Sequence, residues 1–135
     1  MKWLLTNAEE VLLRHIRPSL LHDGLPDSLA FAPFPKDKNL LSVDRGSITT
    51  PRDSHRLFTE NGFECVRVFG VSVGEFASER ITCWADPLSR SDTLKHANPS
   101  HAVADFSPHT TSQQKVIAKR LKRRALSRGS LYDAV

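Results

Sequence analysis

The sequence predicts one α+β domain over residues 1–135: a small, mostly antiparallel sheet of about four or five strands covered by helices, ending in a basic amphipathic helix. Three observations lead to this prediction. The 135 residues are 39% hydrophobic and 25% charged, which is typical of a single globular domain. Strand-like apolar runs are interrupted by single helical segments without regular alternation. Residues 110–128 carry seven cations and no acidic residue.

The first element is predicted to be a helix that ends or bends at Pro18. Thr6-Asn7-Ala8-Glu9 fits a capping box. Apolar side chains then recur at three- and four-residue spacing, at Ala8, Val11, Leu12, His15 and Ile16. We interpret His15 as a core-edge residue of this stripe rather than a functional one. Residues 20–38 are rich in proline and turn signals, which predicts an irregular chain with at most a short strand at Ser28 to Ala32.

A strand and a second helix are predicted next. Leu40-Leu41-Ser42-Val43 has the composition of a strand, and the turn at Asp44-Arg45-Gly46 closes it. Thr50-Pro51 opens a helix, because Thr is a good cap and Pro is tolerated at the first helical position. Asn61-Gly62 ends that helix.

The strongest strand signal covers residues 65–73, where Gly70 indicates a bulge or a close backbone approach. Residues 80–85 alternate polar and apolar side chains and are predicted to be the hairpin partner of that strand. The spacing Gly70-Val71-Ser72-Val73-Gly74 is that of a nucleophile elbow, but we expect no helix behind it, so the sequence disfavours a hydrolase. Residues 87–100 are predicted to be a polar loop, and residues 101–106 a short strand.

The last helix is predicted to be capped at Thr110, Thr111 or Ser112 and to end at Gly129. Its apolar side chains form one narrow stripe, made of Ile117, Ala118, Leu121 and Ala125. Its cations are the candidate partner-binding residues: Lys115, Lys119, Arg120, Lys122, Arg123 and Arg124. Such a cluster attracts a nucleic-acid backbone or an acidic protein surface, or it is a solvated face without a partner. The stripe lacks the Trp or Phe that anchors an interfacial helix, which disfavours a membrane surface.

Recognisable catalytic and metal-binding signatures are lacking. Cys65 and Cys83 form no C-x-x-C pair and are predicted to be reduced thiols in or near the core. The spacing of His96, His101 and His109 matches no zinc pattern, even with Asp86 and Asp105 added. We therefore predict no metal site, no cofactor and no catalytic residue.

These patterns favour a small, non-enzymatic binding module of the cytoplasm, with an immunity, antitoxin-like or assembly-subunit role. It would dock on an acidic protein surface or a nucleic-acid backbone through the basic helix and the loop at 87–100. The alternative is a nucleic-acid-binding protein or a small metal-independent nuclease that uses His55 or His101, with Arg56 and Arg67 near His55. Glu9 and Glu10 interrupt the first apolar run too early for a secretory signal, and no run approaches the roughly 18 apolar residues of a membrane-spanning helix.

Overall fold

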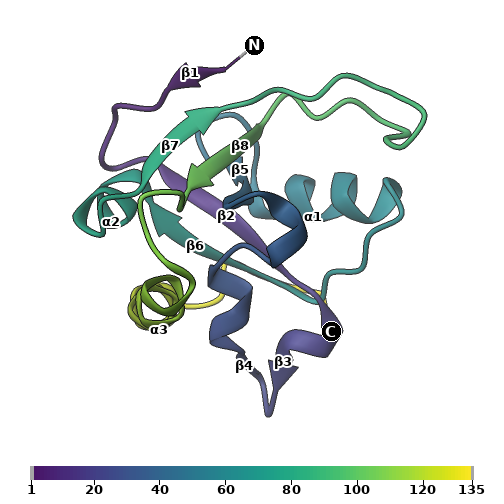
Figure 1. Ribbon diagram of the computed structural model, residues 1–135. Helices are drawn as coiled ribbons and strands as arrows, with labels where there is room; N and C mark the ends of the chain where they lie inside the picture. Colours follow the sequence, from purple (N-terminus) through teal and green to yellow (C-terminus); the bar gives the residue numbers. More distant parts are fainter. Residues whose placement is uncertain (1, 135) are drawn as a thin grey trace.

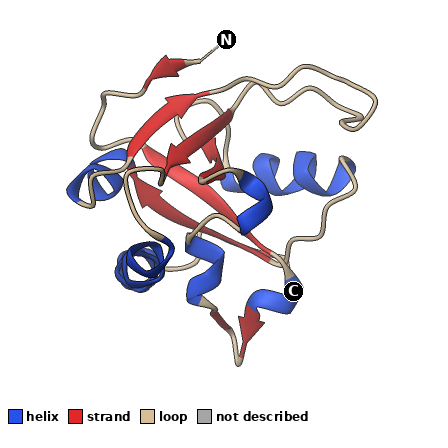
Figure 2. Cartoon of the chain, viewed as in Figure 1, coloured by secondary structure: helices blue, strands red, loops and turns tan. Residues whose placement is uncertain are grey.

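The computed structural model describes residues 2–134, which form a seven-stranded antiparallel sheet and a separate two-stranded sheet, with helices around them (Figures 1 and 2). The predicted α+β class is therefore confirmed. The large sheet has the order β1-β7-β8-β5-β2-β6-β9. Its strands are β1 (Trp3–Leu4), β2 (Val11–Ile16), β5 (Leu40–Arg45), β6 (Arg67–Ser72), β7 (Thr82–Ala85), β8 (His101–Asp105) and β9 (Tyr132–Asp133). The sheet exceeds the predicted size because the two-residue strands β1 and β9 extend its edges.

The α-helices are α1 (Pro51–Glu60), α2 (Val73–Ser78) and α3 (Thr111–Arg128). Shorter elements fill the segment between β2 and β5: the 3-10 helices η1 (Pro18–Leu20), η2 (Ser28–Phe31) and η3 (Pro35–Asp37), and the small sheet of β3 (Leu21–His22) and β4 (Leu25–Pro26). Helices α1 and α3 begin and end as predicted. Thr50 and Thr110 accept hydrogen bonds from the third helical amides, and Gly62 and Gly129 follow the two helices with positive φ.

Helices cover both faces of the sheet (Figure 1). The main hydrophobic core lies between one face and α2, α3 and η2. A second, smaller cluster lies under α1 on the other face. Strand β2 shows the division, because Leu12 and Ile16 belong to the main core while Leu13 belongs to the cluster under α1.

The prediction of a helix after Thr6 is wrong, because residues 11–16 form β2, which pairs with β5 on one side and β6 on the other. A central strand with both faces covered carries apolar side chains on both sides. Such a strand can reproduce three- and four-residue spacing by chance. The apparent cap is a local turn in which the Glu9 amide donates to Asn7 Oδ1.

The predicted hairpin of residues 65–73 with 80–85 is also wrong. Helix α2 follows β6 directly, and β7 pairs with β1 and β8 instead. Ser72 caps α2 in a capping box with Glu75. Gly70 lies in unbroken register opposite Leu13, so there is no bulge, but a Cβ atom there would lie 2.6 Å from Val11 Cγ1. Of the two predicted reasons for this glycine, close approach is therefore the right one.

Three smaller findings complete the fold. Residues 28–31 form η2, capped by the Asp27 carboxylate, rather than a strand. Cys65 and Cys83 are free and buried, as predicted, and burial raises their pKa values to about 11 and about 12. Within residues 2–134, no helix has the length and apolar character needed to cross a membrane.

Candidate functional site

Helix α3 carries its cations in two rows with different surroundings. Arg120, Arg124 and Arg128 follow one another at four-residue spacing, and we call them the arginine row. Arg120 binds the Glu79 carboxylate through two nitrogens, at 2.7 to 3.1 Å, and Arg128 Nη1 lies 2.8 Å from Glu75 Oε1. The hydrogen bond from Arg120 holds the pKa of Glu79 below its ordinary value, and the charge of Arg124 acts in the same direction. This row therefore joins α3 to α2.

The second row consists of the exposed or half-buried cations Lys115, Lys119, Lys122 and Arg123, and we call it the lysine row. Among residues 2–134, no carboxylate lies within ion-pair distance of these four side chains. The row spans about 12 Å of helix, since each residue advances the axis by about 1.5 Å. Of the six predicted binding residues, four thus face solvent unpaired, Arg120 is engaged by Glu79, and Arg124 stands between the two ion pairs.

Packing holds the lysine row in place. Ile117, Ala118, Leu121 and Ala125, the apolar stripe predicted from the sequence, are all buried in the main core. Gln114 is buried with them, and its amide donates to Asn39 Oδ1 and to the carbonyls of Phe106 and His109. The row is therefore presented on an anchored surface.

An apolar feature adjoins the lysine row. Val116 is 51% exposed although it is a large aliphatic residue on the outer face of α3. It lines a hollow of about 490 Å³ between the end of α2 and the first half of α3. The lining also includes Ser78, Glu79, His109, Gln113 and Arg120. A partner surface could place an apolar side chain there beside the cations.

A second candidate site lies where β2 and β5 separate. The two strands share the register pairs Leu12↔Arg45 and Leu13↔Asp44, while β2 pairs along its whole length with β6. Beyond those pairs the strands diverge, and a cavity of about 260 Å³ opens between Arg14 and residues 41–44. We call it the β2–β5 cleft. A neighbouring groove of about 560 Å³ shares several of its residues: Arg14, His15, Arg17, Lys36, Phe58 and Phe63.

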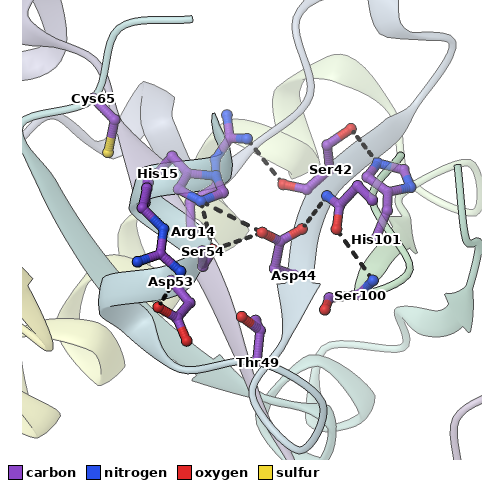
Figure 3. Close-up of polar contacts among 12 residues, drawn as sticks. Arg14, His15, Ser42, Asp44, Thr49, Asp53, Ser54, Cys65, Ser100 and His101 are labelled. Atoms are coloured by element: carbon purple, nitrogen blue, oxygen red, sulfur yellow. Dashed lines mark hydrogen bonds and ion pairs between the residues drawn. The ribbon is translucent and has the colours of Figure 1, made fainter. Parts of the chain in front are cut away.

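A buried polar network forms the inner wall of the cleft (Figure 3). Asp44 is 3% exposed. Its carboxylate accepts hydrogen bonds from Ser54 Oγ at 2.6 Å and from Asn98 Nδ2 at 2.8 Å. His15 Nε2 lies 2.7 Å from Ser54 Oγ and 3.6 Å from Asp44 Oδ2. Because the Ser54 proton is donated to Asp44, the Ser54 oxygen accepts from His15 Nε2–H, which sets the tautomer of the ring. The network joins the sheet, α1 and the loop at 87–100.

His15 is neutral in the folded protein. Its side chain is 7% exposed and stacks on Phe58, with ring centroids 4.1 Å apart. Burial lowers its pKa from 6.5 to about 4, against the opposing attraction of Asp44. The interpretation of His15 as a core-edge residue agrees with this geometry, although His15 lies on strand β2 rather than on a helix.

This neutral histidine predicts a pH dependence of stability. Between pH 6.5 and about 4 the unfolded chain protonates His15 while the folded chain does not, so stability falls as the pH falls through that window. The variant His15→Gln keeps a donor for Ser54 but does not titrate. Over this pH window the wild type should lose about 1–3 kcal/mol more unfolding free energy than the variant. Urea unfolding of both proteins across that pH range measures the difference. Parallel curves would refute the prediction.

The cations at the mouth of the cleft are unpaired. Arg14 Nε donates to Ala30 O at 2.6 Å and Arg14 Nη1 to Ser42 O at 2.9 Å, so this side chain bridges the gap between the diverging strands. The Arg17 guanidinium lies over the Phe34 ring, 5.2 Å from its centroid. In the described part of the chain, no carboxylate is within ion-pair distance of Arg14, Arg17 or Lys36.

The structure separates the histidines considered for catalysis. His55 Nε2 lies 2.8 Å from Cys65 O, and its ring packs beside Tyr132. His101 Nδ1 lies 2.9 Å from Asp86 O, and its Nε2 lies 3.2 Å from Ser42 Oγ. Each histidine therefore holds local structure on a different part of the molecule.

The remaining candidate groups are likewise engaged. Arg56 forms ion pairs with Asp53 and Glu60, and Arg67 pairs with Asp133. No three of the His, Cys, Asp and Glu side chains between residues 2 and 134 are placed to hold a metal ion.

Ser72 does stand between a strand and a helix, contrary to prediction. It has ordinary extended backbone angles, and its hydroxyl caps α2 rather than facing a base.

Comparison with known proteins finds no matching family model, no similar curated protein and no similar solved structure. The functional conclusions below therefore depend on the geometry of these two sites.

Proposed function

We propose that the protein is a non-enzymatic binding module that docks on an acidic surface of a macromolecular partner through the lysine row of α3. The observation that carries the proposal is that four cations stand side by side on an anchored helix without an ion pair to any carboxylate of residues 2–134, while Arg120 and Arg128 of the neighbouring arginine row are paired with Glu79 and Glu75. Like charges at this spacing repel one another, so the lysine row lowers the stability of the isolated helix. A partner that supplies negative charge removes that repulsion.

Two features favour an acidic protein over a nucleic-acid backbone. Exposed Val116 and its adjoining hollow offer a place for an apolar side chain, which a phosphate backbone lacks. The exposed residues of α3 include no aromatic ring on which a base could stack. An immunity, antitoxin-like or assembly-subunit role requires this kind of protein contact.

Reversing Lys119, Lys122 and Arg123 to Glu should weaken partner capture by about 100-fold or more, because attraction becomes repulsion at three points of contact. The measurement is affinity capture from an extract of the source organism, repeated after nuclease digestion. Circular dichroism should be unchanged, since these side chains contribute little to the core.

The matched control reverses Lys2, Lys38 and Arg52, which are exposed and lie off α3, and gives the same change in net charge. Capture of the same protein by the wild type and this control, resistant to nuclease and lost in the α3 variant, supports the proposal. Capture that nuclease abolishes would instead assign the row to a nucleic-acid backbone, and equal capture by all three proteins would discard the docking role.

A further inference from the structure

We propose that the β2–β5 cleft binds a small organic anion, with the phosphate or carboxylate of the ligand held by Arg14, Arg17 and Lys36 and its body held between aromatic side chains. The proposal concerns residues remote from α3 in sequence and is independent of the docking function above. It has three supports: an excess of cations that form no ion pair within the described residues, an inner wall whose polar groups are already hydrogen-bonded, and a cavity of suitable size and chemistry.

Arg14 forms no ion pair with a carboxylate of residues 2–134, although it is the most enclosed of the three cations. Arg14 is partly buried in the gap between two strands, and both of its hydrogen-bond partners are neutral carbonyls. Burial, followed by the nearby charge of Arg17, lowers the pKa of Arg14 to about 10, against the opposing attraction of the Asp37 carboxylate. A buried guanidinium without a counter-ion is costly, and an oxyanion beside it would recover that cost with charge-assisted hydrogen bonds.

The carboxylates of the cleft form no ion pair with Arg14, Arg17 or Lys36 in the described part of the chain. Asp44 accepts from Ser54 and Asn98, so its oxygens are engaged at the inner wall. Asp37 Oδ2 accepts from the backbone amide of Phe34 in the η3 turn. Glu64 lies at the far side of the neighbouring groove, outside the lining of the cleft itself. In the cleft lining the three cations Arg14, Arg17 and Lys36 outnumber the two carboxylates of Asp37 and Asp44, so the lining keeps a net positive charge.

The walls suit a flat or apolar body. Phe58 stacks between the His15 and Phe63 rings, at centroid distances of 4.1 and 4.9 Å, and Phe34 stands opposite Arg17. The neutral state of His15 adds no charge to this stack. The cavity of about 260 Å³ is slightly below the usual range for ligand sites, roughly 300 to 1,000 Å³, so the ligand is small.

Isothermal titration and thermal unfolding with four probes test the proposal: phenyl phosphate, benzoate, inorganic phosphate and uncharged phenol. We expect phenyl phosphate or benzoate to bind and to raise the melting temperature, inorganic phosphate to bind more weakly, and phenol not to bind at equal concentration. The stronger of the two aromatic anions identifies the preferred acid group. Absence of binding by both at millimolar concentration, or equal binding of phenol, would overturn the proposal.

Variants locate the site. The double variant Arg17→Gln with Lys36→Gln should weaken binding of the aromatic anion by about 10- to 100-fold. Both side chains are exposed, so this variant should fold even if Arg14→Gln, which loses the bridge between the strands, does not. Lys119→Gln with Arg123→Gln removes two charges from the lysine row and should leave anion binding unchanged. An equal loss in both double variants would show unspecific attraction to a basic protein and would refute the site.

Discussion

Replacing Asp44 by Ala should reduce the free energy of unfolding by about 3–5 kcal/mol, a large part of the roughly 5–15 kcal/mol that holds a domain folded. Asp44 is buried and accepts from Ser54 and Asn98. Alanine would remove the acceptor of the buried Ser54 hydroxyl and of the half-buried Asn98 amide, and an unpaired buried donor costs about 1–3 kcal/mol, with a smaller cost for the half-buried one. The effect should spread, because Ser54 belongs to α1 and Asn98 to the loop at 87–100.

Urea unfolding measures this loss, and hydrogen exchange locates it, with faster exchange expected in α1 and in residues 87–100. Asp92→Ala is the matched control, because Asp92 is an exposed aspartate in the same loop and should change stability by less than about 0.5 kcal/mol. Equal unfolding midpoints for the two variants would mean that the network contributes no net stability.

The elements that the sequence predicted well carry their own local signals. Helices α1 and α3 are marked by Thr50 and Thr110 at their starts and by Gly62 and Gly129 after their ends, and such signals act over a few residues. Helix α2 had a signal of the same kind, because Ser72 and Glu75 have the spacing of a capping box. A helix that starts after Ser72 separates β6 from β7 and excludes a hairpin between them.

Strand β2 had no comparable signal. Its neighbours β5 and β6 come from segments about 30 and 55 residues further along the chain. Whether Leu12 and Leu13 are both buried depends on helices that cover opposite faces of the sheet. Periodicity within one segment cannot report this, so the strand resembled an amphipathic helix.

The two candidate sites also differ in how far a single segment of the sequence predicts them. The lysine row was visible from the sequence because it belongs to one helix, and its apolar anchors could be counted on a wheel. The β2–β5 cleft was not visible, since Arg14, Lys36, Asp44 and Phe58 come from separate segments that only the folded chain brings together. Even the ion pairs of the arginine row required the structure, because Glu75 lies in α2 and Glu79 directly follows it, and the sequence prediction missed that helix.

Replacing Leu121 by Ala should lower the unfolding free energy by about 2–5 kcal/mol, through lost burial and the cavity that remains. Leu121 lies on the buried face of α3 and is 1% exposed. Alanine is the better helix former, so the loss would report packing rather than helix propensity. Val116→Ala is the control on the same helix, because its exposed side chain should contribute less than about 0.5 kcal/mol.

The like charges of α3 oppose helix formation at several four-residue spacings, including Lys115 with Lys119 and Lys119 with Arg123. Contacts of the apolar stripe with the core must offset that repulsion. We therefore expect Leu121→Ala to speed amide exchange in α3 more than in the strands of the sheet. Added salt should restore part of the lost unfolding free energy by screening the like charges of the lysine row. Equal unfolding midpoints for the Leu121 and Val116 variants would show that α3 is not held by its apolar stripe.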